Sequence, residues 1–289
     1  MKDSALYTLP LCVPCLARTA LRLIELSGAD AKSAEELLRF VMQDLSQVPY
    51  DVPAPVHTGR LFAHIARRTG VADPFAAAKQ RATTMALDLL PRYEQRVNSD
   101  KNPFATAIRL AIAGNVIDLA TRDDVPESEL LTVIEKTLAA ALPTTTLESL
   151  EQAISSASRI LFLADNAGEI VFDRPLLNLL PRDKITLAVR GGPILNDATL
   201  VEARASGLQD LVSIVDNGSA IPGTWLPDCS EEFQRIYDQA DLLISKGQGN
   251  FETLWGRTSI PTFFLFRVKC EGIQARVHSP VDTDMLLQG

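Results

Sequence analysis

Hydrophobic residues recur every three to four positions over most of the first half of the chain. This spacing predicts amphipathic or mostly apolar helices at residues 33–45, 61–69, 74–90, 102–120 and 128–141. Asn102 and Pro103 suit a helix start, because asparagine caps free N–H groups and proline is tolerated in the first turn. We therefore expect an all-helical N-terminal part, residues 1–145.

The pattern changes in the second half, where short apolar runs alternate with helical spacing. Strands are predicted at residues 160–164, 184–189, 211–215, 241–245 and 262–268, and helices at residues 169–180, 197–206 and 231–240. This alternation predicts βαβ units, and apolar strand interiors indicate that both sheet faces are covered. We expect an α/β fold with a parallel sheet of about five strands in residues 146–289.

Polar or glycine-rich segments follow the predicted strands. They are Asp165-Asn166-Ala167-Gly168-Glu169, Arg190-Gly191-Gly192-Pro193 leading to Asn196-Asp197, Asp216-Asn217-Gly218, Lys246-Gly247-Gln248-Gly249-Asn250, and Lys269. Because the carboxyl ends of parallel strands meet at one edge of the sheet, these segments should converge where such folds bind ligands. Each segment alone is equally typical of a turn, a helix cap or a solvated strand end, so the prediction depends on their joint placement.

The side chains of these segments suit two kinds of ligand. Asp165, Asn166 and Asp197 offer carboxylate and amide oxygens, which a hard divalent cation such as Mg²⁺ or Mn²⁺ prefers. Lys246, Lys269 and the N–H groups of helix starts suit phosphate oxygens. A cation beside a phosphate cradle is what phosphoryl transfer to water needs, so the sequence predicts a phosphatase.

The amino-acid composition limits the kinds of binding partner that can be expected. The chain has 289 residues, 46% of them hydrophobic, which is enough for a full core. Its net charge of -8 and lack of a basic tract argue against nucleic acid as a partner, and no apolar run reaches the ~18 residues of a membrane span. The four cysteines do not form a disulfide framework, and there is no apolar leader at the N-terminus. We expect a cytoplasmic protein whose partner is a small phosphorylated metabolite, and the oligomeric state stays open.

Four motifs together resemble the damage-control phosphatases, a family first catalogued as domain of unknown function 89. They are AGNVID at 113–118, FLADNAGE at 162–169, PILNDAT at 193–199 and SKGQGNFE at 245–252. Their order and approximate spacing also fit, and the resemblance spans nearly the whole chain. The opening CVPC at 12–15 is similar to the prokaryotic branch of the family.

The resemblance implies a Rossmann-like C-terminal half and metal-dependent hydrolysis of phosphate esters. The implied substrates are sugar phosphates and damaged phosphometabolites, and the implied cofactor is Mg²⁺, Mn²⁺, Co²⁺ or Ni²⁺. By that likeness, Asp165, Asn166 and Asp197 are both metal ligands and catalytic residues. The residues implied to bind the substrate or its phosphate are Asn115, Glu169, Lys246, Gly247, Asn250 and Lys269.

Several alternatives stay open. The attacking group is either a metal-activated water or Asp165 itself. Asp165 is followed by Asn166 and Ala167 and so does not begin an Asp-x-Asp nucleophile motif, which favours water. A methyltransferase using S-adenosylmethionine is a competing interpretation because the family has been linked to carboxyl methylation. Such enzymes usually have a glycine-rich turn after their first strand, whereas the turn after the first predicted strand here has a single glycine, Gly168. A non-catalytic binding module on the same fold would show neither metal dependence nor turnover.

Cys12 and Cys15 are expected to be inert, since a closed zinc site needs four ligands.

Overall fold

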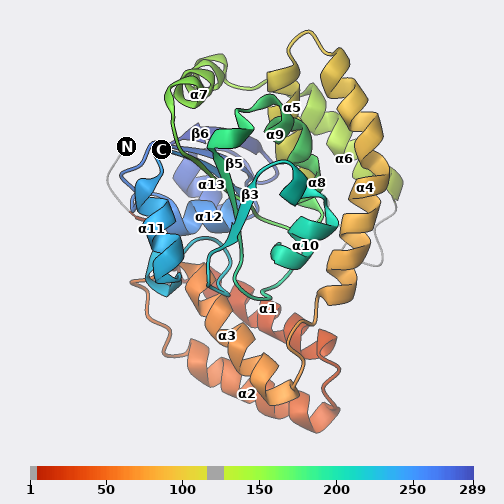
Figure 1. Ribbon diagram of the computed structural model, residues 1–289. Helices are drawn as coiled ribbons and strands as arrows, with labels where there is room; N and C mark the ends of the chain where they lie inside the picture. The colour runs from red at the N-terminus through yellow and green to blue at the C-terminus, as the bar shows by residue number, and fades with distance from the viewer. Residues whose placement is uncertain (1–4, 116–126) are drawn as a thin grey trace.

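A central β-sheet with helices on both faces forms the body of the computed structural model, which describes residues 5–115 and 127–289 (Figure 1). The sheet has six strands in the order β3-β2-β1-β4-β5-β6. They are β1 (Ile160–Leu163), β2 (Ile185–Val189), β3 (Ser213–Asp216), β4 (Leu242–Lys246), β5 (Thr262–Arg267) and β6 (Asp284–Gln288). The first five are parallel, and β6 pairs antiparallel with β5. The predicted α/β fold with about five parallel strands is confirmed, and β6 adds an antiparallel edge strand.

Alternate residues of the central strand face two different cores, as the period of a strand requires. Ile160 and Phe162 of β1 pack in a large core with the helices on one face, while Leu161 and Leu163 pack with those on the other. The first face carries α4 (Ala76–Ser99), α5 (Pro103–Ala113), α6 (Glu127–Ala139), α7 (Thr144–Ser156), α8 (Glu169–Phe172), α9 (Arg174–Leu179) and α10 (Leu200–Ala205). The second face carries α11 (Glu231–Gln239), α12 (Gly247–Leu254) and α13 (Glu271–Val277). Single-turn 3₁₀ helices lie at Arg182–Lys184, Leu208–Asp210 and Leu226–Asp228.

The first three helices form a separate layer beyond the carboxyl ends of the strands (Figure 1). They are α1 (Cys12–Leu26), α2 (Ala31–Leu45) and α3 (Ala54–Thr69), and they share a hydrophobic core of their own. Ile194 and Leu195, from the loop that follows β2, pack into this core. The helical layer is thereby fixed against the edge of the sheet where the predicted site lies.

Some predicted element boundaries differ from the structure. Helix α4 does not stop before Pro91 but runs to Ser99, because Tyr93 and Val97 are buried against the sheet-side core and packing outweighs the lost hydrogen bond. The predicted helix 169–180 is divided into α8 and α9 at Asp173. The parts of the predicted helix and loop that fall at 116–126 lie outside the described residues.

The predicted division at residue 145 falls inside α7 and stays a prediction. In their packing, α4 to α7 share one core with the sheet, whereas α1 to α3 have their own. Among the residues that the structure describes, none of the helices combines the length and apolar character needed to cross a membrane.

Candidate active site

Two loops run side by side at the carboxyl end of β1. The segment after β1 and the segment before α10 form a short antiparallel bridge between Asn166 and Asp197. Backbone hydrogen bonds of 2.8 and 2.9 Å join the two segments, one donated from each side. The bridge brings the three predicted metal ligands, Asp165, Asn166 and Asp197, to one point of the sheet edge. Their side chains are at most 6% exposed.

The carboxylate of Asp165 lies directly against the first residue of α12. A β-carbon built on Gly247 would overlap the carboxylate carbon and both oxygens of Asp165, so glycine is the residue that leaves room for it. Gly247 also has φ +79°, a left-handed conformation that glycine adopts without strain. Lys246, Gly247 and Asn250 were predicted to contact the substrate, which stays a prediction. In the structure, Gly247 and Asn250 lie in the first turn of α12, which packs against Asp165.

Two asparagine side chains converge on Asp165 and Glu169. The Nδ2 group of Asn115 donates to Asp165 Oδ2 at 3.2 Å and to Glu169 Oε2 at 3.0 Å. The Nδ2 group of Asn166 donates to the same two oxygens at 3.0 and 3.1 Å. The amide oxygen of Asn115 is buried and has no hydrogen-bond partner among the described residues. A buried acceptor of this kind is suited to a ligand that supplies positive charge or a donor.

Lys246 lies in a buried cluster with two carboxylates. Its Nζ donates to Glu169 Oε1 at 2.7 Å and to Asp173 Oδ1 at 2.6 Å, and all three side chains are at most 1% exposed. Burial raises the pKa of Asp173 to about 7, although the charge of Lys246 opposes the rise. Burial lowers the pKa of Lys246, but the charges of Asp173 and Glu169 outweigh it and hold that pKa above its ordinary value. Contact of Lys246 with a substrate phosphate stays a prediction.

Asp173 was not predicted from the sequence. Its Oδ2 atom has no hydrogen-bond partner in the part of the chain that the structure describes. The signal that could have found it is its spacing of four residues from Glu169, which places both carboxylates on one side of a helical turn.

Arg190 follows β2 and pairs with Asp197. Its Nε donates to Asp197 Oδ2 at 2.7 Å, and the arginine is 2% exposed. Burial raises the pKa of Asp197; the charge and hydrogen bond of Arg190 oppose this rise, as do the charge of Lys269 and a backbone hydrogen bond from Gly223. The sequence placed Arg190 at this edge without assigning it a role, because a single arginine at a strand end is usually solvated.

Asn250, a predicted substrate contact, is fully buried and bonded within the protein. Its Nδ2 donates to the backbone oxygens of Ala164 and Lys246 at 3.0 and 2.7 Å. Its Oδ1 accepts from Thr224 Oγ1 at 2.7 Å and from Arg190 at 3.3 Å. Its predicted contact with a substrate is untested, but its amide already has four partners here.

Lys269 differs from the other predicted residues because it is exposed. It follows β5. Burial raises the pKa values of Asp197 and Glu252, and the positive charge of Lys269 opposes both rises. Its backbone N–H donates to Gln248 Oε1 at 2.8 Å, which ties it to the first turn of α12. The lysine is therefore on the same edge as the buried acids, on the solvent side.

The charges of the buried side chains do not cancel. Asp197 pairs with Arg190, whereas two carboxylates, those of Glu169 and Asp173, share the ammonium of Lys246. Burying more carboxylates than cations is costly, and a bound cation would offset part of that cost.

The donors available to such a cation are mixed. Within residues 5–115 and 127–289, no three His, Cys, Asp or Glu side chains are placed to hold a metal ion. A cation at this edge would therefore take amide oxygen from Asn166 or Asn115 beside the carboxylates of Asp165 and Asp197. Carboxylate and amide oxygens fit Mg²⁺ and Mn²⁺.

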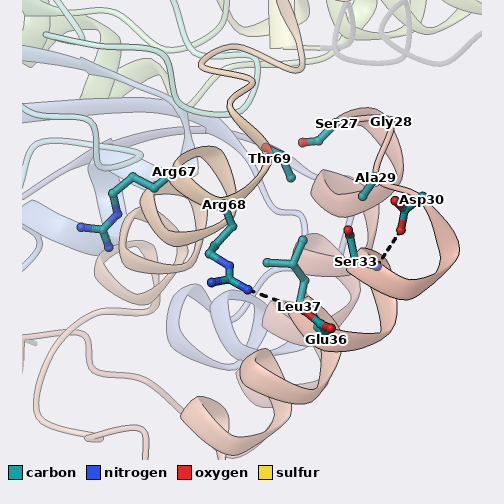
Figure 2. Close-up of a pocket in the computed structure, with 10 residues that line it drawn as sticks. All are labelled: Ser27, Gly28, Ala29, Asp30, Ser33, Glu36, Leu37, Arg67, Arg68 and Thr69. Carbon is teal, nitrogen blue, oxygen red and sulfur yellow. Dashed lines mark hydrogen bonds and ion pairs between the residues drawn. The ribbon is translucent and has the colours of Figure 1, made fainter.

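A pocket of about 520 Å³ lies elsewhere, on the helical layer (Figure 2). It is lined by the turn after α1, the first turns of α2 and the end of α3, and its lining residues include none of the predicted site residues. Two of its charged side chains bond within the protein: Asp30 caps α2 by accepting from the Ser33 N–H, and Arg68 pairs with Glu36 (Figure 2).

The four cysteines are free thiols. Cys12 begins α1, and burial raises the pKa values of both Cys12 and Cys15. A raised pKa leaves little thiolate at neutral pH, which favours the inert interpretation of this pair.

Together, the parallel sheet, the helical layer and the acidic strand ends define a class of protein. Residues 8–284 match the family described as the Damage-control phosphatase ARMT1-like domain, and the chain belongs to this family. The family indicated by the four motifs is thus confirmed.

Two relatives bear the family's name. The chain is 30% identical over 273 residues to a damage-control phosphatase of Pyrococcus horikoshii, with 93% of each chain covered. It is also 30% identical over 272 residues to a damage-control phosphatase of Archaeoglobus fulgidus, covering 91% of this chain and 93% of that one. The crystal structure of a DUF89 family protein from P. horikoshii has the same fold, with a TM-score of 0.88, 28% identity and coverage of 98% and 99% of the two chains.

Proposed function

We propose that this protein is a phosphatase that hydrolyses phosphate esters of small metabolites with the aid of a divalent cation. Family membership and the two relatives named damage-control phosphatases support the phosphatase activity. The proposed substrates are sugar phosphates or damaged phosphometabolites. The proposed ligands of the cation are Asp165, Asn166 and Asp197.

One observation supports the metal dependence: the buried carboxylates of Asp165 and Glu169 lie beside the amide oxygen of Asn115, which has no hydrogen-bond partner among the described residues. Burial raises the pKa values of Asp173 and Asp197, so a cation bound at this edge would compete with protons for these carboxylates. A bound Mg²⁺ or Mn²⁺ would supply the missing charge and would offset the negative charge of a phosphoryl group.

The remaining residues have separate roles in this proposal. The amides of Asn115 and Asn166 hold Asp165 and Glu169 in place. Lys246 holds the Glu169 carboxylate by an ion pair from the interior side, and Lys269 attracts the phosphate from the solvent side. Water is the proposed attacking group, because Asp165 is already committed to the two amides and to the cation.

The test is a screen of sugar phosphates and other phosphate esters with Mg²⁺, Mn²⁺, Co²⁺ and Ni²⁺, run with and without EDTA. We expect hydrolysis that depends on one of these ions and stops with EDTA. Isolation of a phosphorylated Asp165 during turnover would replace water as the attacking group. Turnover that survives complete removal of metal would refute the metal dependence, and no turnover of any ester would refute the activity.

A further inference from the structure

We propose that Arg190 and Asn250 are positioning residues, which fix the carboxylate of Asp197 relative to Asp165 so that both reach one cation. This inference rests on the proposed metal-dependent function. It assigns a role to Arg190 and gives Asn250 a different role from the substrate contact predicted for it.

The first step is the geometry of Arg190. Its Nε bonds to Asp197 Oδ2 at 2.7 Å, and its second nitrogen, Nη2, bonds to the backbone oxygen of Ala164 at 3.1 Å. Ala164 directly precedes Asp165. Because the guanidinium is planar and rigid, it sets the spacing between the Asp197 side chain and the backbone that carries Asp165.

The second step is the position of Asn250. It also bonds to the Ala164 oxygen, at 3.0 Å, and to the backbone oxygen of Lys246 at 2.7 Å. Its own oxygen accepts from Arg190 at 3.3 Å. Arg190 and Asn250 therefore connect the carboxyl ends of three strands: β1 through Ala164, β2 through Arg190 itself and β4 through Lys246. Asn250 is 0% exposed, so its amide is used inside the protein.

The third step concerns Thr224, which lies in the loop after β3. Its hydroxyl lies 2.7 Å from Asn250 Oδ1 and 3.5 Å from Arg190 Nη1. The next residue back, Gly223, donates its backbone N–H to Asp197. The same loop thus contacts both positioning residues and the carboxylate that they orient, as partners behind a metal ligand do.

The experiment compares two Arg→Lys changes in the full chain. Arg190→Lys keeps the charge but loses the fork that reaches both Asp197 and Ala164. Arg267→Lys is the matched control, because Arg267 forks onto Asp284 at 2.8 and 2.9 Å in a pair that contacts no predicted site residue. Mn²⁺ affinity is measured by calorimetry, and kcat and KM on a phosphate ester at saturating Mn²⁺.

We expect Arg190→Lys to weaken Mn²⁺ binding about 10- to 100-fold, the range found when a partner of a metal ligand is lost. The control should bind Mn²⁺ as the wild type does. Thr224→Val, which removes one hydroxyl, should weaken Mn²⁺ binding less but in the same direction, and it serves if Arg190→Lys does not fold.

Two results would overturn the inference. One is unchanged Mn²⁺ affinity in both Arg190→Lys and Thr224→Val. The other is a raised KM for the ester with unchanged Mn²⁺ affinity, which would make Arg190 or Asn250 a substrate contact. A wild-type protein that binds none of Mg²⁺, Mn²⁺, Co²⁺ and Ni²⁺ would refute the proposed metal dependence itself. This is measured before any variant is made, and the ion that binds replaces Mn²⁺ if Mn²⁺ does not.

Discussion

Two buried ion clusters lie at the same edge of the sheet and are balanced differently. Around Asp197, one carboxylate meets one guanidinium, and the guanidinium has further partners on the backbone. Around Lys246, two carboxylates share one ammonium, and the amides of Asn115 and Asn166 join one of them, Glu169, to Asp165. The first cluster pairs one carboxylate with one cation, while the second has two carboxylates for one cation.

The difference indicates how the two clusters respond to change. Removing one partner of a balanced buried pair leaves the other charge buried without compensation, which destabilises the fold. Removing a carboxylate from the unbalanced cluster relieves repulsion. Mutations of the same chemical type should therefore have opposite effects on stability in the two places.

The largest effect is expected for Lys246→Met. The change keeps the volume of the side chain but leaves Glu169 and Asp173 without their cation, so we expect a loss of about 3–5 kcal/mol in the free energy of unfolding. Urea unfolding measures it. Lys136→Met, at an exposed position of α6, should stay within about 0.5 kcal/mol of the wild type. Equal stability of the two variants would mean that the cluster is not ionised.

Asp165→Asn should reduce kcat/KM by about 10²- to 10³-fold, because the cation contributes several kcal/mol to the transition state. In metal-free buffer the variant should be about as stable as the wild type, since asparagine keeps the shape of the side chain and removes the cost of burying a charge. Asp216→Asn is the matched control, an exposed carboxylate at the end of β3, and it should keep its activity. Full activity of Asp165→Asn would contradict the metal site.

Metal binding should itself stabilise the fold. Free Mn²⁺ at 100 times its dissociation constant should raise the free energy of unfolding by about 2.7 kcal/mol. Thermal unfolding with Mn²⁺ and with EDTA measures the difference, which should vanish in Asp165→Asn. A stabilisation of the same size in that variant would place the ion elsewhere.

Asp173→Asn should change how stability depends on pH in metal-free buffer. The pKa of Asp173 is raised from 3.8 to about 7, so between these values the folded state holds a proton that the unfolded state has lost. Stability of the wild type therefore falls as pH rises from about 4 to about 7, by up to about 1.4 kcal/mol per pH unit from this group. The variant should lack this part of the slope, whereas Asp88→Asn, at an exposed position, should keep it. Urea unfolding at pH 5 and pH 7.5 tests this, and parallel slopes would contradict it.

The smallest effect is expected on the helical layer. Arg68 and Glu36 are 3.7 Å apart with side chains 61% and 54% exposed, and a pair of this kind contributes at most about 0.5 kcal/mol. Arg68→Ala should unfold like the wild type and keep its activity, although it lines the pocket of Figure 2. A clear loss of activity would give that pocket a role.

The sequence predicted best those strands whose residues are buried along the whole length of the strand. The strands β1, β4 and β5 are almost wholly buried, so their apolar runs stand out from the flanking polar residues. The edge strand β6 was missed, because its five residues are mostly half-buried and carry no such run. The extension of α4 past Pro91 was missed because local sequence does not show the core that Tyr93 and Val97 reach.

The site was predictable as a location but only partly as a network. The rule of strand ends placed Asp165, Asn166 and Asp197 together, and the structure joins their segments by a backbone bridge. Arg190 and Asp173 were not assigned, since their burial depends on partners 7 to 73 residues away in the chain. A residue's neighbours across that separation leave no trace in its local pattern.

The close approach of Gly247 to Asp165 limits how the chain can vary over generations. Gly28 has a similar backbone, with φ +66°, but a β-carbon there would meet nothing within 4 Å, so an asparagine is acceptable. At 247 even an alanine methyl would occupy the space of the carboxylate. A complete substitution library selected for turnover should return many residues at position 28 and glycine alone at position 247.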